Sequence, residues 1–183
     1  MAEFVIAAIE GFGLRNGGFV LRELTLIFPD DSEQHFQFKN PEDLCLNEAE
    51  MKTAKFAQKY LNGFHPSDDE NCCLPYVVYP KILDNIQNCR IYCAGEVSHS
   101  FFTRNLPYSR VIDVCTLMDF SYPVELDNPG CFKLHHYRYC SLAKARHIRR
   151  RMEGSRPWLV LNFTSDNCLE FPLLNGIISL LAI

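Results

Sequence analysis

The sequence predicts an α/β domain built on a mixed sheet, in which three antiparallel strands precede alternating helices and strands. Residues 1–40 contain three β-rich segments separated by turn signals at Asn16-Gly17-Gly18 and at Pro29–Ser32. Apolar residues with helical spacing first appear from Asn47 onward. After residue 90, short β-rich segments alternate with helical ones. We expect helices to flank the resulting sheet.

Length and composition predict one domain spanning residues 1–183. The chain has 183 residues, of which 48% are hydrophobic and 22% are charged, and its net charge is −4. We expect no membrane partner, because we find neither an apolar run of bilayer length nor a signal-peptide pattern. The expected location is therefore intracellular, cytoplasmic or nuclear. In such a compartment the nine cysteines are expected to be thiols or metal ligands rather than disulfides.

The three strands at the start of the chain are predicted from their β-forming residues. The first covers Glu3–Ile9 as a buried apolar run, and it is expected to end before Glu10. The second covers Phe19–Phe28 and is rich in β-formers. The third covers Gln34–Lys39, where apolar and polar residues alternate. Together they form an antiparallel meander.

The first helix is predicted over Asn47–Asn62. Asn47 is placed to cap it, Glu50 stands three residues later as in a capping box, and Gly63 is placed to end it. The sequence then predicts a short helix over Tyr76–Ile86, a strand over Arg90–Ala94, a helix over Val97–Arg104, a strand over Arg110–Cys115 and a helix over Ser141–Met152.

This order of elements resembles the ribonuclease H-like plan. Nucleases of this plan bind two divalent metal ions through carboxylates, and their first strand supplies two of these acids as Asp-x-Glu. Residues i and i+2 of a strand face the same side, so both acids reach one metal pair. Here the tripeptide Ala8-Ile9-Glu10 fits that frame with alanine at the first acid position.

The stretch VIAAIEGF resembles the first motif of the DEDD family of 3′–5′ exonucleases, especially its Asp-Ile-Glu-Gly form in arenavirus nucleoproteins. The segment Val20–Leu26 resembles the second strand of those proteins and of the Maelstrom domain of animal piRNA-pathway proteins. For an active nuclease the resemblance implies Mg²⁺ or Mn²⁺ as cofactor. Ala8 has two open explanations, natural loss or an inactivating substitution made by design. Taken alone, Glu10 is also consistent with an ordinary acid at a strand end.

The other catalytic positions favour a degenerate domain. His99 stands where the resemblance expects an aspartate, and Tyr139 and Lys144 stand for the histidine and aspartate of the final motif. A protonated lysine cannot ligate a metal. Asp113 is the remaining strand-end acid that could partly substitute, so Glu10 and Asp113 are the candidate catalytic remnants. The Maelstrom domain has lost the same acids while keeping the fold, and it is the better match.

The strongest chemical signal is the stretch CFKLHHYRYC, residues 131–140. It brings Cys131, His135 and Cys140 within ten residues, and zinc prefers four such ligands in a tetrahedron. Glu23 on the second strand is available as a fourth ligand. The resemblance implies the same Glu-Cys-His-Cys set, with a structural Zn²⁺ that pins the last helix to the sheet.

Alternatives to this zinc site are open. Three residues separate Cys131 from His135 and four separate it from His136, whereas the usual form of the motif has two, so either histidine could be the ligand. The cluster could also arise by chance in a cysteine-rich chain. In that case Glu23 could be a surface partner of Arg22.

A basic stretch ends the candidate domain. Residues 133–156 contain one acidic residue, Glu153, and eight basic ones, which are Lys133, Arg138, Lys144, Arg146, Arg149, Arg150, Arg151 and Arg156. We predict that Arg146, Arg149, Arg150 and Arg151 form a helical face that contacts nucleic acid phosphates in a salt-dependent manner. The alternative is a solvated face that balances an acidic body.

Three functions are open at this stage. The favoured one is a zinc-stabilised, catalytically degenerate domain that binds single-stranded or structured RNA in small-RNA silencing or its evasion. The second is a metal-dependent 3′–5′ exonuclease whose first aspartate has been replaced by Ala8. The third is a protein-interaction scaffold that uses an apolar surface such as Leu173–Ile183.

Overall fold

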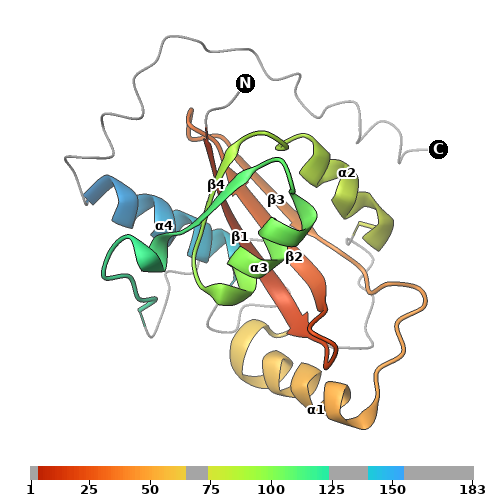
Figure 1. The fold of residues 1–183 in the computed structure, drawn as a ribbon. Coiled ribbons are helices and arrows are strands. Elements are labelled where there is room, and N and C mark those ends of the chain that lie inside the picture. Colours follow the sequence, from red (N-terminus) through yellow and green to blue (C-terminus); the bar gives the residue numbers. More distant parts are fainter. Residues whose placement is uncertain (1–3, 65–73, 124–139, 155–183) are drawn as a thin grey trace.

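The computed structural model describes residues 4–64, 74–123 and 140–154. In these residues a mixed sheet has the strand order β3-β2-β1-β4-β5 (Figure 1). The strands are β1 (Phe4–Gly13), β2 (Phe19–Ile27), β3 (Glu33–Gln37), β4 (Arg90–Cys93) and β5 (Arg110–Asp113). Strand β1 is central, antiparallel to β2 and parallel to β4. The predicted α/β class and its mixed sheet are confirmed.

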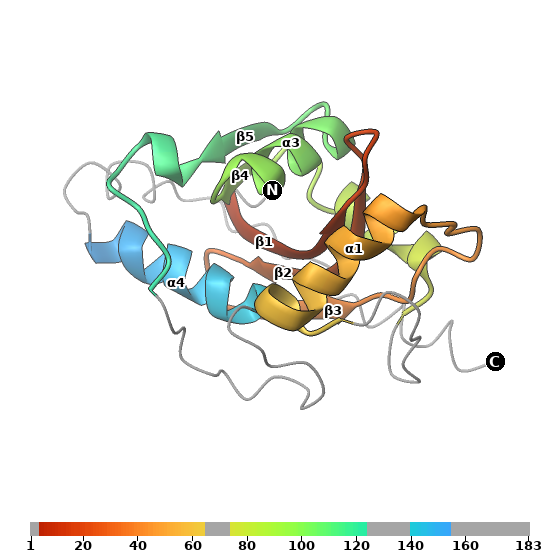
Figure 2. The same ribbon diagram turned by 90° about the horizontal axis from the view of Figure 1, so that it is seen from below.

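Helices flank this sheet on both faces and at one end. They are α1 (Glu48–Ala57), α2 (Tyr79–Asp84), α3 (Glu96–Asn105) and α4 (Ser141–Gly154). Helices α2 and α3 share a core with one face of the sheet, and α4 shares a second core with the opposite face (Figure 2). Helix α1 packs at the far end of β1 and β2.

Alternation along β1 decides which residues face α4. Val5, Ala7 and Ile9 belong to the core under α2 and α3, whereas Ile6 and Ala8 belong to the core under α4. Strand β1 is therefore apolar on both faces and buried on both, which explains its continuous hydrophobic run. Glu10, two residues after Ala8, follows on the α4 face.

Strand β1 is longer than predicted, because it continues through Glu10 to Gly13. The pairing with β2 shifts register between Glu10 and Gly11, as in a β-bulge. A Cβ atom at Gly11 would overlap the backbone oxygen of Val20. A glycine is thus required at position 11 by the close approach of two strands.

Helix α1 begins and ends as its sequence predicts. Asn47 accepts a hydrogen bond from the Glu50 amide, the Glu50 carboxylate accepts one from the Asn47 amide, and Gly63 ends the segment with φ 78°. The last part of the predicted helix is a π-helical turn, η1 (Gln58–Asn62), which the sequence pattern does not reveal.

Two predicted elements are shorter than expected. The helix predicted over Tyr76–Ile86 is a 3₁₀ turn, η2 (Tyr76–Val78), followed by α2, with Pro80 in the first helical turn where no amide donor is needed. The strand predicted to reach Cys115 ends at Asp113, because the Asp113 carboxylate caps a 3₁₀ turn, η3 (Val114–Thr116).

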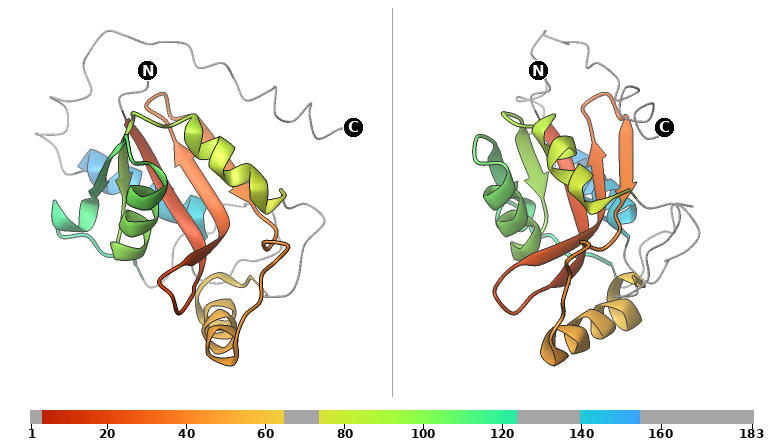
Figure 3. Two further views of the ribbon diagram at one scale, coloured as in Figure 1. Left: turned by 45° about the vertical axis from the view of Figure 1, so that its right-hand side comes forward. Right: turned by 90° about the vertical axis from the view of Figure 1, so that its right-hand side faces the viewer.

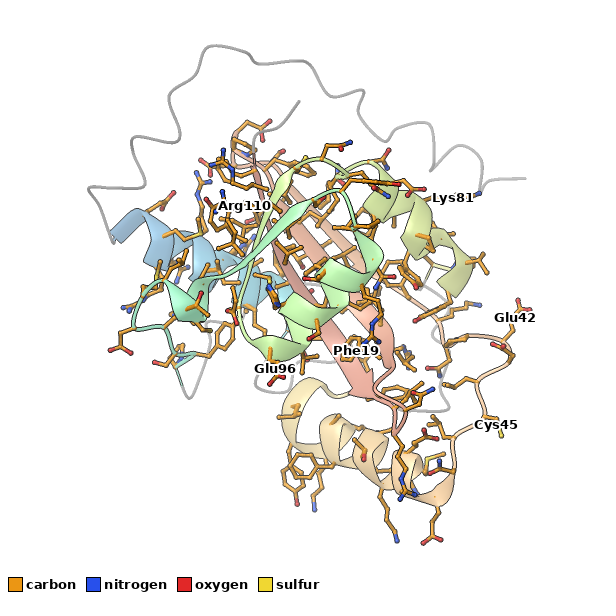
Figure 4. All side chains as sticks on the ribbon, viewed as in Figure 1. Phe19, Glu42, Cys45, Lys81, Glu96 and Arg110 are labelled. Atoms are coloured by element: carbon orange, nitrogen blue, oxygen red, sulfur yellow. The ribbon has the colours of Figure 1, made fainter. Side chains whose placement is uncertain are left out.

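The carboxyl ends of β1, β4 and β5 lie at one edge of the sheet, because these strands are parallel. In Figure 4, Glu96, which follows β4, and Phe19, at the start of β2, lie toward the α1 end of the molecule, whereas Arg110 lies at the other end. Figure 3 shows α1 at this same end of β1 and β2. Helix α1 therefore borders the edge where strand-end side chains gather.

Replacement Gly11→Ala is expected to destabilise the fold by about 1–3 kcal/mol, because the new methyl group must displace the β2 backbone. Urea unfolding measures this change. Gly13→Ala is the matched control, since a Cβ atom there meets nothing within 4 Å, and its effect should stay within about 0.5 kcal/mol. Equal stability of the two variants would contradict the bulge.

Candidate functional site

Two rows of side chains cross the antiparallel strands on the face that α4 covers. The rows are Glu10–Glu23–Gln37 and Ala8–Thr25–His35. Glu10 and Glu23 are both buried and stand directly opposite each other on neighbouring strands. Facing carboxylates repel, and burial strengthens the repulsion because it removes water. This row therefore requires cations and hydrogen-bond donors around the two carboxylates.

Lys144 supplies the cation for Glu10. It lies on the first turn of α4, and its ammonium group forms an ion pair with Glu10 Oε1. The Glu10 side chain is 7% exposed and the Lys144 side chain 21%. The ring of Tyr122 lies 5.4 Å from Lys144 Nζ and covers the pair. Burial and the negative charge of Glu10 raise the pKa of the Tyr122 phenol, so its hydroxyl stays protonated at neutral pH.

Glu23 obtains donors from three directions. Its Oε2 accepts a hydrogen bond of 2.6 Å from the Ser141 amide at the start of α4. Its Oε1 accepts one of 3.2 Å from Gln37 Nε2 and lies 3.3 Å from His35 Nε2. Burial acts to raise the pKa of Glu23, but His35, Ser141 and Gln37 together hold that pKa below its usual value. Glu23 is therefore an ionised buried carboxylate.

A closed ring of polar contacts joins Glu23 to the start of α4. Thr25 Oγ1 lies 2.7 Å from His35 Nδ1 and 2.7 Å from Ser141 Oγ. If His35 Nε2 carries the proton toward Glu23, Nδ1 accepts from Thr25, and Thr25 accepts in turn from Ser141. The Ser141 amide closes the ring on Glu23. This network fixes the first turn of α4 against β2 and β3.

Arg22 is not the partner of Glu23, so that alternative is wrong. Arg22 is buried; its Nε donates to the Phe38 carbonyl at 2.9 Å, and a terminal nitrogen donates to Asn40 Oδ1 at 3.0 Å. Its guanidinium group also lies over the ring of Phe64 at 5.2 Å. Successive residues of a strand face opposite sides, which separates Arg22 from Glu23.

Asp113 is committed to the backbone at the end of β5. Its Oδ1 accepts hydrogen bonds from the amides of Gly95 at 2.9 Å and Cys115 at 3.0 Å, so it joins β5 to the start of α3. Burial and the charge of Asp113 raise the pKa of the Cys93 thiol to about 12. His99 lies on the first turn of α3 and is half-buried. The position of Asp113 thus has a structural explanation.

The described residues do not fit a nuclease metal pair. Glu10 already holds the ammonium group of Lys144, Ala8 offers no ligand, and the bonded Asp113 oxygen faces two backbone amides. Among residues 4–64, 74–123 and 140–154, no three His, Cys, Asp or Glu side chains lie together so as to hold a metal ion.

Two of the four predicted zinc ligands, Glu23 and Cys140, lie within the described residues. Glu23 and Cys140 are both buried, and the Ser141 amide on Glu23 belongs to the residue after Cys140. The Cys140 sulfur accepts a hydrogen bond of 3.4 Å from the Ala143 amide. Glu23 is ionised. Its three donors occupy about three of its four lone-pair positions and leave about one open. Cys131 and His135 lie outside the described residues.

The basic residues of α4 have acidic partners on the β2–β3 hairpin. Arg146 binds Glu33 through two nitrogens at 2.8 and 2.6 Å, and this contact lowers the pKa of Glu33. Arg149 contacts Asp31 at 2.7 Å and Glu153 on its own helix at 2.6 Å. These pairs help to hold α4 on the sheet and reduce the charge that Arg146 and Arg149 offer to a ligand.

Arg150 and Arg151 are exposed, and Arg151 donates to the carbonyl oxygen of Asp119. Contact of all four predicted arginines with nucleic acid stays a prediction.

Thr25, His35 and Ser141 complete the network around Glu23, and the sequence did not lead us to predict them as site residues. A usable signal was present. Pairing the second and third strands across the turn at Pro29–Ser32 sets polar residues of one strand opposite polar residues of the next. The missing information was which helix covers that face.

No protein-family model matches the chain, and no curated protein matches its sequence. None of the helices formed by residues 4–64, 74–123 and 140–154 is long and apolar enough to cross a membrane. The function of the chain is therefore inferred from the residues of the site.

Replacement Lys144→Met is expected to destabilise the fold by about 3 kcal/mol, because it leaves Glu10 buried, charged and opposite Glu23. The double variant Glu10→Gln/Lys144→Met should recover most of that loss. Chemical denaturation of both variants measures the two changes.

The matched control is Lys52→Met, which removes an exposed ion pair of 2.7 Å with Glu48 and should cost less than about 0.5 kcal/mol. A Lys144→Met variant as stable as this control would refute the role given to the buried pair.

Proposed function

We propose that this chain is a zinc-stabilised, catalytically degenerate domain of the ribonuclease H-like fold that binds RNA without metal-dependent cleavage. We further propose that the domain is similar to the Maelstrom domain and acts in small-RNA silencing. This fold assignment is supported by the central β1, its antiparallel neighbour β2 and the parallel strands β4 and β5. A structural Zn²⁺ held by Glu23, Cys140, Cys131 and His135 would fix α4 to β2.

The observation that carries the proposal is the ion pair between Lys144 and Glu10. Nucleases of this plan need carboxylates with open lone pairs to hold two divalent cations. Here an ammonium ion from the protein itself neutralises the first-strand glutamate, and Tyr122 covers it. A single Ala8→Asp substitution would add an acid but would leave this cation in place. The disabled-exonuclease alternative is therefore less well supported.

RNA is the proposed ligand because exposed arginine side chains lie near the end of α4. The hairpin acids Asp31 and Glu33 are matched to Arg149 and Arg146. Exposed Arg150 and Arg151 lie beyond these pairs. Arginine is well suited to phosphate, since its planar fork donates two hydrogen bonds at once. We expect these two side chains to contribute most of the salt-dependent contact on this helix.

The test is binding of a labelled single-stranded RNA, followed by fluorescence anisotropy over a range of salt concentrations. The parent chain and the Ala8→Asp variant should bind equally and leave the RNA intact in Mg²⁺ or Mn²⁺. Arg150→Glu/Arg151→Glu should weaken binding about tenfold or more. It should also reduce the slope of log affinity against log salt concentration by roughly 0.7 for each lost phosphate contact.

Lys81→Glu is the matched control, because Lys81 is an exposed base on α2, which covers the opposite face of the sheet (Figure 4). Degradation of RNA by Ala8→Asp alone would make the chain a disabled exonuclease. Absence of RNA binding by the parent chain would overturn the proposed function.

A further inference from the structure

Helix α1 and the π-turn η1 carry large side chains that the fold does not use. Phe56 is 56% exposed and Tyr60 47%, and their ring centroids lie 4.9 Å apart at an interplanar angle of 45°. Leu61 beside them is also exposed. Single exposed apolar side chains are normal on a protein surface, whereas clustered ones mark interaction sites.

The packing of α1 is complete without this aromatic pair. Ala54 and Ala57 form its buried side and join Phe12 and Val20 at the end of β1 and β2. Small residues on the inner side bring the helix close to the sheet. The large aromatic side chains stand on another side of the same helix. Their position is therefore unexplained by the core.

A row of lysines runs beside the aromatic pair. Lys52, Lys55 and Lys59 are exposed and spaced three and four residues apart, which places them along one side of the helix. Phe56 and Tyr60 each follow one of these lysines by one residue and form the adjacent row. Lys59 Nζ lies 4.9 Å from the Tyr60 ring centroid. The surface therefore combines aromatic faces with ammonium groups.

We propose that Phe56 and Tyr60 form a stacking platform for unpaired bases of a single-stranded nucleic acid, while Lys55 and Lys59 contact its phosphates. This inference rests on the proposed function, because it assigns a second RNA contact to the same domain. Bases stack on aromatic rings in a sequence-tolerant manner, and neighbouring cations follow the backbone. An acidic peptide would also satisfy the lysines, but it would not need two adjacent rings.

The location of α1 agrees with this assignment. Helix α1 packs at the end of β1, and Glu10, which forms an ion pair with Lys144 of α4, lies on the same part of that strand. Ligands of open α/β sheets bind beyond the carboxyl ends of their parallel strands. The π-turn η1, which carries Tyr60, directly continues α1, and π-turns are frequent at functional sites. A bound strand would therefore run along the edge that carries the degenerate site.

The experiment compares the parent chain, Phe56→Ala/Tyr60→Ala and Tyr108→Ala, the last being an aromatic residue of 76% exposure outside this surface. Binding is measured by anisotropy with a labelled single-stranded RNA, the same RNA as a duplex, and an abasic oligonucleotide. The double variant should lose about 5- to 100-fold in affinity for the single strand only. Tyr108→Ala should bind like the parent, and thermal unfolding should show that all three chains fold.

Each outcome separates this inference from the proposed function. If the parent binds single-stranded RNA and the double variant binds it equally well, the platform is overturned while RNA binding stands. Equal affinity of the parent for abasic and normal strands would also overturn it. If the parent binds no RNA, both proposals fail.

Discussion

The structure depends on how it accommodates two buried carboxylates that face each other, Glu10 on β1 and Glu23 on β2. Neither could remain ionised in this position without compensation. The first turn of α4 provides it twice, with the Lys144 ammonium group on Glu10 and the Ser141 amide on Glu23. These contacts set where α4 begins on the sheet. The Arg146–Glu33 pair then holds the helix further along its length.

In the proposed function, this arrangement accounts for binding without hydrolysis. A cation is already present at Glu10, but it is attached to the protein and cannot activate water. The features that the proposed binding domain would use are exposed arginine side chains on α4 and an aromatic surface on α1. The same edge of the sheet can thus serve a strand that is held rather than cut.

The predictability of the fold varied with the range of the forces involved. Asn47, Glu50 and Gly63 act within a few residues, so the limits of the first helical segment were correctly predicted. The first strand was predicted to end before Glu10, because the role of Gly11 depends on Val20 of the neighbouring strand. The sequence suggested that Lys144 had replaced an acid. Its contact with Glu10 could not be predicted without knowing how α4 docks.

The most direct measurement is a titration of the parent chain and Glu10→Gln with Mn²⁺, in which electron paramagnetic resonance reports the free ion. The account predicts that both chains leave the same concentration of free Mn²⁺, because Lys144 already neutralises Glu10. Uptake of Mn²⁺ by the parent chain that disappears in Glu10→Gln would contradict the account, since it would show that Glu10 is an available metal ligand.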